Sequence, residues 1–214
     1  LRRHGVSDAL IDGGGDLAAI GQVQGRPWKV GVRDPLQPER LLAQLPLQAS
    51  AHVLDFGAGT GLLSTAIAPR VAQVTALDMS AAMLQVLDEK GFANITTRQQ
   101  DISAGLPEQY HAIVSCMAMH HVADTAALLH TFAAALHSSG RIALVDLYQE
   151  DGSFHGDDAA NAAKGVQHFG FAPDRLRVLA EQAGLVDIAF SDILSLQQHN
   201  GRAYPLFLMT GRKP

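Results

Sequence analysis

Residues 53–61 read VLDFGAGTG and decide the fold class of this chain. The apolar run over residues 51–56 (AHVLDF) predicts a short buried strand of a parallel sheet. The glycines that follow allow a tight turn and a close approach of the backbone to a ligand. A helix is predicted to begin at Leu62, so the glycine loop lies at the carboxyl edge of the sheet, where doubly wound folds bind nucleotides.

Outward from this loop, strand and helix patterns alternate along the chain. The predicted strands span residues 51–56, 73–77, 94–98, 111–116, 141–147, 186–190 and 204–210, and the predicted helices span residues 62–68, 80–89, 125–137 and 173–183. Such alternation predicts a mainly parallel sheet with right-handed crossovers. Only a loop, residues 191–203, joins the last two strands, which favours an antiparallel pair. We therefore expect an α/β fold with a doubly wound, seven-stranded, mostly parallel sheet and one antiparallel strand near its edge.

The spacing of the glycines and the acid before them indicate the ligand. Dinucleotide sites carry the pattern G-x-G-x-x-G, whereas Leu62 stands where its third glycine would fall. A carboxylate at Asp55 would repel a pyrophosphate, but it suits a ligand with an amino group. S-adenosylmethionine has an ammonium, a sulfonium and no phosphate. The loop therefore favours this cofactor over the nucleotide of an oxidoreductase, which is the first alternative.

Two further acids follow predicted strands at the same edge. Asp78 ends the second strand, where a carboxylate can accept hydrogen bonds from ribose hydroxyls. Asp101 follows the third strand and can accept from an adenine amino group, while Ile102 can pack on the adenine ring. Together with the glycine loop, these residues predict an adenosyl-binding site.

Residues 40–214 resemble the class I S-adenosylmethionine-dependent methyltransferases. Asp55 and the three glycines match the first motif of that family, Asp78 matches its ribose-binding acid, and Asp101 matches its adenine-binding acid. Residues 115–122 (SCMAMHHV) match the segment that lines the methionine end of the cofactor, and residues 138–141 resemble the turn before the fifth strand. The resemblance implies a Rossmann-like methyltransferase fold and an enzyme that uses S-adenosyl-L-methionine. The residues expected to contact the cofactor are Asp55, Gly57, Ala58, Gly59, Gly61, Asp78, Met79, Asp101, Ile102 and Met117.

Methyl transfer makes few demands on catalytic side chains, because the sulfonium is already activated. The enzyme has to align the acceptor, exclude water and in some cases remove a proton. His121, beside His120 after the fourth strand, is one candidate, although a histidine bonded to backbone is the commoner case. His155 and His168 follow the fifth strand, in segments that resemble a subgroup of small methyltransferases of unsettled substrate. We expect one of these two to touch the acceptor.

The histidines and acids after the fifth strand are also compatible with a metal site. A polar loop held by its own hydrogen bonds is the commoner explanation of such a segment. We therefore expect no metal.

Residues 1–35 follow a different pattern, with short predicted strands over 6–15, 17–23 and 27–32 separated by glycine turns. They resemble a piece of the FAD:protein FMN transferases of the ApbE type, through DGGGD at 12–16 and the segment around Pro27 and Trp28. The later metal-binding and catalytic segments of that family have no counterpart, so no flavin transfer is expected. The sequence predicts an appendage over 1–35, typical of a fusion or misjoined gene fragment, and a cofactor-binding domain over 36–214. The appendage stands where class I methyltransferases usually have helices over the cofactor, so we expect weakened cofactor binding.

The amino-acid composition and charge indicate which partners and which cellular compartment to expect. Hydrophobic residues make up 47% and charged residues 17%, which is typical of a globular chain. The net charge of −5, without a basic stripe, argues against nucleic acid. A single cysteine, Cys116, and the lack of a membrane-length apolar run or a signal core predict a cytoplasmic protein without a membrane partner. The expected partner is a small-molecule methyl acceptor, and the oligomeric state stays open.

Two alternatives remain beside the oxidoreductase. The unusual N-terminal segment keeps open a non-catalytic or inactivated S-adenosylmethionine-binding module. The acidic charge disfavours methylation of a nucleic acid. The lack of an Asn-Pro-Pro-Tyr-type segment after the fourth strand, which methylases of amino groups in bases and proteins often carry, disfavours methylation of a base or a protein.

Overall fold

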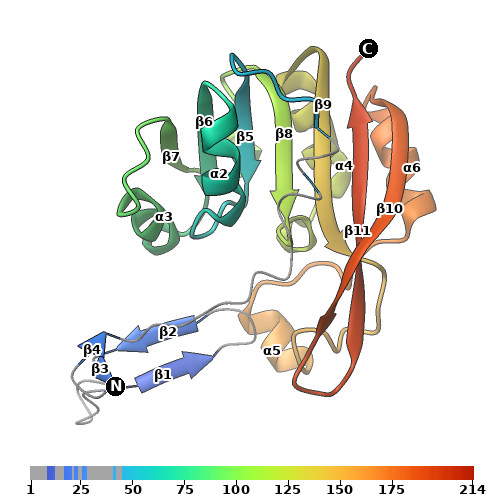
Figure 1. The fold of residues 1–214 in the computed structure, drawn as a ribbon. Coiled ribbons are helices and arrows are strands. Elements are labelled where there is room, and N and C mark those ends of the chain that lie inside the picture. The colour runs from blue at the N-terminus through green and yellow to red at the C-terminus, as the bar shows by residue number, and fades with distance from the viewer. Residues whose placement is uncertain (1–8, 13–16, 21, 24–25, 28–40, 42–44) are drawn as a thin grey trace. The chain divides into compact units, whose positions relative to one another are not determined.

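The computed structural model describes residues 9–12, 17–20, 22–23, 26–27, 41 and 45–214 (Figure 1). Contacts divide the chain into two units, Leu1–Pro35 and Leu36–Pro214. In the first unit, two antiparallel pairs form: β1 (Ala9–Asp12) with β2 (Leu17–Ile20), and β3 (Gln22–Val23) with β4 (Arg26–Pro27). A short N-terminal β segment is thus confirmed, although most of the predicted strand over 27–32 lies outside the described residues.

The second unit is built on a seven-stranded sheet (Figure 1). Its strands are β5 (His52–Phe56), β6 (Gln73–Asp78), β7 (Ile95–Gln99), β8 (Tyr110–Cys116), β9 (Leu136–Leu147), β10 (Val186–Gln197) and β11 (Ala203–Arg212). They lie in the order β10-β11-β9-β8-β5-β6-β7. The pairs among β5 to β9 are parallel, and β11 runs antiparallel to both β9 and β10. The predicted α/β fold, with one antiparallel strand next to an edge, is confirmed.

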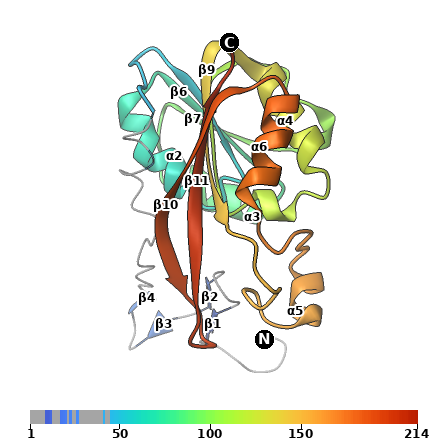
Figure 2. The ribbon, with the colours of Figure 1, turned by 90° about the vertical axis from the view of Figure 1, so that its right-hand side faces the viewer.

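Helices cover both faces of the sheet (Figures 1 and 2). They are α2 (Leu62–Ile67), α3 (Ala81–Asp88), α4 (Thr125–Ala135), α5 (Asp158–Ala163) and α6 (Pro173–Gln182), with short 3-10 turns η2 (Ala68–Arg70), η3 (Ile102–Ala104) and η4 (Met119–His121). Figure 2 shows the sheet between α2 on one side and α4 and α6 on the other.

The inner strand β5 contributes to both hydrophobic cores. Val53 belongs to the core that contains Leu63 of α2, whereas Leu54 belongs to the core that contains Phe132 of α4. Successive residues of a strand point to opposite faces, so a strand covered on both sides has to be apolar throughout. This explains why the adjacent residues Val53 and Leu54 are both apolar and why apolar and polar residues do not simply alternate along β5.

Several boundaries differ from the predicted ones. β10 continues to Gln197 and β11 begins at Ala203, so the connection is much shorter than the loop predicted over 191–203. β9 begins at Leu136, where the predicted helix still continued. In the edge strand β10, exposed polar residues such as Ser191 and Asp192 have no local hydrophobic pattern. They form a strand because they pair with β11.

The segment between β9 and α6 contains one helix that was not predicted, α5. Its N-cap is Asp157, whose side chain accepts from the backbone N–H of Ala160 at 2.9 Å. The predicted N-cap of α3 is confirmed, because Ser80 Oγ accepts from the Met83 N–H at 3.3 Å. In the part of the chain that the structure describes, no helix has the length and apolarity to cross a membrane.

Candidate cofactor and acceptor site

The glycine loop is fixed at the carboxyl edge of the sheet by backbone hydrogen bonds. The N–H groups of Gly57 and Ala58 both donate to the Leu77 carbonyl, at 2.8 and 3.0 Å. The N–H of Gly59 donates to Oδ2 of Asp78 at 2.8 Å. The loop after β5 is therefore attached to the end of β6, which is the neighbouring strand.

Two glycines of the loop are required for different reasons. Gly57 has a φ of +67°, and a Cβ there would lie 2.2 Å from the Cβ of Ala118. Gly59 has a φ of +53°, but a Cβ there would meet no atom within 4 Å. One side of the loop is thus packed against the turn after β8, while the other side has room for a ligand.

The Asp78 carboxylate binds backbone on both oxygens. Besides the contact with Gly59, its Oδ1 accepts from the Ser80 N–H at 2.8 Å. The side chain is only half-buried, and each carboxylate oxygen can accept more than one hydrogen bond. The acid therefore shapes the loop and retains acceptor capacity for two ligand hydroxyls.

Asp55 is the buried acid of the loop. Its Oδ2 accepts from Ser64 Oγ of α2 at 2.6 Å. Burial raises the pKa of Asp55 to about 6, the nearby Asp78 charge adds to this, and the hydrogen bond from Ser64 opposes it. A nearby cation would favour the ionised form, so the position suits a ligand that carries an ammonium.

Three residues predicted to contact the cofactor lie on loops that follow β6 and β7. Met79 is 68% exposed, and its carbonyl accepts from Nε2 of Gln99 at 3.2 Å. Asp101 is exposed and caps η3 by accepting from the Ser103 N–H at 2.8 Å. Ile102 is half-buried and packs against the core on the α4 side. The two loops are therefore adjacent, as their parallel strands are.

Met117 follows β8 in the left-handed region of backbone conformation, with a φ of +55°. Its N–H donates to the Val145 carbonyl of β9 at 2.9 Å. Such a conformation is strained for a residue with a side chain and persists only when the surroundings hold it. It sets the course of the turn that contacts Gly57 through Ala118.

Beyond this turn, a chain of polar contacts links β9 to the loop that follows it. His120 is 1% exposed, and its Nδ1 lies 2.8 Å from Oδ1 of Asp146, which is fully buried. Its Nε2 lies 3.2 Å from Nε2 of His155. Sequence reasoning favoured His121 and missed the buried role of His120; the signal available was an acid at the end of the fifth strand.

His121 and His155 both lie next to His120, with ring centroids 4.2 and 5.2 Å from the centroid of the His120 ring. Burial, and to a smaller extent the neighbouring His120, lowers the pKa of His155 to about 4, so this imidazole is neutral at neutral pH. His121 is exposed, and its Nδ1 lies 3.3 Å from the Gly165 carbonyl. The structure thus brings together two of the three predicted catalytic histidines.

His168, the third, has a different surrounding. Its Nε2 lies 3.0 and 3.1 Å from the carbonyls of Val122 and Ala123, and 3.2 Å from Oγ1 of Thr125. The ring nitrogen is therefore directed at the backbone where α4 begins. Its backbone N–H donates to the His120 carbonyl at 3.1 Å, which attaches the His168 segment to η4.

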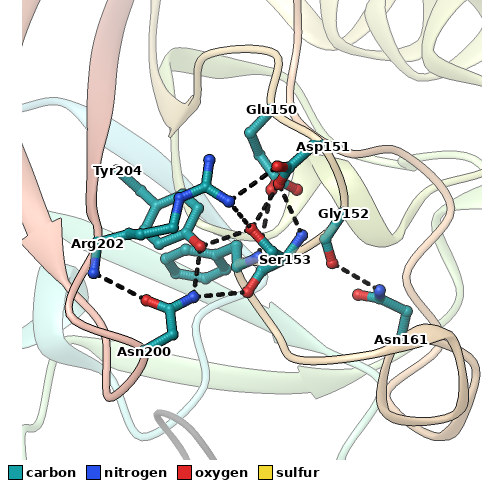
Figure 3. A network of polar contacts seen from close by, with 9 residues as sticks. Glu150, Asp151, Gly152, Ser153, Asn161, Asn200, Arg202 and Tyr204 are labelled. Carbon is teal, nitrogen blue, oxygen red and sulfur yellow. Dashed lines mark hydrogen bonds and ion pairs between the residues drawn. The ribbon is translucent and has the colours of Figure 1, made fainter.

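A polar network attaches the His155 loop to the β10–β11 hairpin (Figure 3). The hydroxyl of Tyr204 lies 2.7 Å from Ser153 Oγ and accepts from Nδ2 of Asn200 at 2.6 Å. Arg202 donates to Asp151 at 2.8 Å and to Ser153 at 2.6 Å. Hydrogen bonding from Ser153 and then Arg202 holds the pKa of Asp151 well below its usual range. The hairpin therefore positions the loop that carries His155.

A cavity also lies at the opposite edge of the sheet, lined by residues that include Leu45, His111, His137 and Gly140. These residues are at the amino ends of the central strands, whereas the glycine loop and the acids are at the carboxyl ends. Ligands of doubly wound sheets bind at the carboxyl ends, so we place the candidate site there.

Comparison with known proteins identifies the family of the chain. A family model described as a methyltransferase domain matches residues 32–189, and a model of the ApbE family matches residues 1–56. The chain is 29% identical over 155 residues to an uncharacterized methyltransferase of Schizosaccharomyces pombe, covering 64% of this chain and 54% of the relative. It thus spans about half the length of that relative.

Solved structures share the fold. The YcgJ protein of Bacillus subtilis superposes with a TM-score of 0.66 at 20% identity, covering 82% of this chain and 97% of the other. Phosphoethanolamine N-methyltransferase 2 of Haemonchus contortus, in complex with S-adenosyl-L-methionine, superposes with a TM-score of 0.68 at 16% identity, covering 83% and 52%. Because the methyltransferase model matches more than half of the chain, this protein belongs to the methyltransferase domain family.

Proposed function

We propose that this chain binds S-adenosylmethionine along residues 57–61 and transfers its methyl group to a small-molecule acceptor. The observation that carries the proposal is the hydrogen bond from Gly59 to Asp78, because it places a glycine loop with open space beside a carboxylate that can still accept. Family membership supports the reaction, and the Haemonchus neighbour, which is in complex with S-adenosyl-L-methionine, supports the cofactor.

The residues proposed to hold the cofactor divide by chemistry. Asp78 would accept from the ribose hydroxyls, and Asp101 from the adenine amino group, with Met79 and Ile102 against the ring. Asp55 would face the ammonium end, directly or through water. The backbone of the loop and turn supplies the remaining contacts, through Gly57, Ala58, Gly59, Gly61 and Met117.

When bound, the cofactor supplies a methyl group already activated by its sulfonium. The tasks left to the chain are alignment and exclusion of water. We place the acceptor beside Met117, under the loop that carries His155, and near the exposed His121. His168 would act as a positioning residue, because its ring holds the start of α4 and the turn that carries His120 and His121.

The acceptor proposed is small. A net charge of −5 disfavours nucleic acid, and the Haemonchus neighbour is named for a small amino alcohol phosphate. We also propose that residues 1–35 are a separate flavin-transferase-like appendage without flavin-transfer activity. The single Cys116 suits a reducing compartment, and we propose a cytoplasmic location on that ground.

Calorimetric titration of the purified protein with S-adenosylmethionine, and in parallel with NADH, tests the cofactor. Binding of the first alone is expected, and binding of NADH alone would overturn the proposal in favour of an oxidoreductase. Formation of S-adenosylhomocysteine is then followed with panels of small hydroxyl and amine acceptors, a protein extract and an RNA pool. Cofactor binding without turnover on any of them would favour the non-catalytic module.

A further inference from the structure

We propose that His120, His121 and His155 together bind one divalent transition-metal ion. One ring nitrogen from each of the three lies within 4.8 Å of the others. The residues come from two separate segments, η4 and the loop after β9, which the fold brings to one point at the carboxyl edge of the sheet. Sequence reasoning favoured no metal because it could not place His155 beside His120.

The separation of two of the nitrogens fits a shared ion. The Nε2 atoms of His120 and His155 face each other at 3.2 Å. Two histidine nitrogens, each about 2.0–2.1 Å from a tetrahedral zinc ion, lie about 3.3 Å apart. In the absence of an ion, one of the two Nε2 atoms has to carry a proton and donate it to the other, and a metal ion would take the place of that proton.

The contacts at Nδ1 of His120 and His121 favour the tautomer in which Nδ1 carries the proton, which is the tautomer needed for a metal bond at Nε2. Nδ1 of His120 is bonded to the Asp146 carboxylate at 2.8 Å, and Nδ1 of His121 lies 3.3 Å from the Gly165 carbonyl. When Nδ1 carries the proton, the lone pair is on Nε2. Metal-binding histidines usually donate their other N–H to a carboxylate or carbonyl in this way. Asp146 also supplies a buried negative charge next to the proposed cation.

The side chain of the third proposed ligand, His121, can change its position. His121 is the exposed ring of the three, so a rotation of its side chain can bring its nitrogen closer to those of His120 and His155.

Three imidazoles favour zinc, cobalt, nickel or copper over magnesium or calcium, which prefer oxygen ligands. A site with three protein ligands keeps a position for water or another small ligand. If the proposed function also holds, and this extension rests on it, that position suits an oxygen or nitrogen of the methyl acceptor.

The test uses the untagged protein of 214 residues after removal of metals with a chelator. Co(II) is added and visible absorption is followed, because a tetrahedral nitrogen-ligated Co(II) ion absorbs strongly; Zn(II) is then added as a competitor. One Co(II) per chain, displaced by one Zn(II), is expected. This measurement needs neither S-adenosylmethionine nor an acceptor, so its failure is distinguishable from failure of the proposed function.

Variants identify the ligands. His121→Ala and His155→Ala leave the buried His120 ring in place. Each should lower the Co(II) affinity by more than about 10–100-fold, which is the effect typical of losing a hydrogen-bond partner of a metal ligand. Asp146→Asn should lower it by about 10–100-fold. His130→Ala, an exposed histidine on α4 outside the cluster, should bind Co(II) as the wild type does. Absence of the absorption band in folded protein, or a band unchanged in both His121→Ala and His155→Ala, would overturn the proposal.

Discussion

The backbone N–H of Gly59 donates a 2.8 Å hydrogen bond to Oδ2 of Asp78, across 19 residues of sequence. This contact joins the loop after β5 to the end of the neighbouring parallel strand. The same carboxylate also accepts from Ser80, at the start of α3. Asp78 is therefore both a structural partner of the glycine loop and the proposed ribose-binding acid.

Asp78→Ala should abolish measurable binding of S-adenosylmethionine. Hydrogen bonds to a charged group contribute about 1.5–3 kcal/mol each, so losing the ribose contacts and the loop contact together should lower affinity by at least about 100-fold. Calorimetric titration measures this. Asp88→Ala is the matched control, because Asp88 is an exposed acid of α3 that contacts Thr97 instead. Equal affinity of the Asp78 variant and the control would contradict the prediction.

Gly57→Ala should destabilise the protein more than Gly91→Ala does. Both glycines have a positive φ, +67° and +72°, so each substitution brings backbone strain of about 1–2 kcal/mol. Only at Gly57 would the new Cβ collide with Ala118, while nothing lies within 4 Å at Gly91. Overpacking adds about 1–3 kcal/mol. Urea unfolding measures the free energy of unfolding of the two variants. Equal values would show that the turn after β8 shifts enough to accommodate the new methyl group.

Asp55 should make the ligand-free protein less stable as the pH rises from about 4 to about 6. The folded-state pKa, about 6, is above the ordinary value of 3.8, so the folded state binds the proton more tightly than the unfolded state. The stabilisation is complete below the unfolded pKa and is lost as the pH passes through the folded pKa. Relative to Asp55→Asn, the wild type should lose about 3 kcal/mol across this range.

Urea unfolding of wild type and Asp55→Asn at a series of pH values measures this difference. The asparagine keeps an oxygen that can accept from Ser64, so the comparison isolates the charge. Parallel stability curves for the two proteins would show that the carboxyl group ionises normally inside the fold.

Tyr204→Phe should loosen the loop that carries His155. It removes the hydroxyl that links Ser153 to Asn200, at a cost of about 1 kcal/mol. Amide hydrogen exchange should accelerate over residues 151–155 without a change in cofactor affinity. Tyr148→Phe is the control, since its hydroxyl donates to Asp192 at 2.5 Å rather than to the loop. Exchange that is equally slow in both variants would contradict the anchoring role of the hairpin.

His155→Ala and His168→Ala should each lower turnover with little effect on the affinity for S-adenosylmethionine. His155 lies in the cluster on the acceptor side, whereas His168 acts through the start of α4, so only His168→Ala should also lower the thermal midpoint clearly. Steady-state rates with a working acceptor and calorimetry separate these effects. Unchanged turnover in both variants would exclude both histidines from the acceptor site.

The architecture followed from local patterns. Adjacent apolar residues such as Val53 and Leu54 indicate a strand covered on both faces, and glycines at strand ends indicate loops at the carboxyl edge. These signals are contained in a few neighbouring residues, and they predicted the sheet and its one antiparallel strand. The antiparallel pair of β10 and β11 was predicted, but the extension of β10 beyond residue 190 was not, because residues such as Ser191 and Asp192 have no apolar periodicity and form a strand only by pairing.

By itself, then, the sequence determined the fold class, the glycine loop and the acids at the ends of neighbouring strands, since parallel strands in register carry their ends to one edge. Only the tertiary structure decided which histidines meet. His120 is buried because Asp146, on the adjacent strand, accepts from its ring, and His155 reaches it because the hairpin holds its loop in place. Such contacts join residues 26 and 35 positions apart, and no local spacing specifies them; they depend on how strands, turns and loops pack around one another.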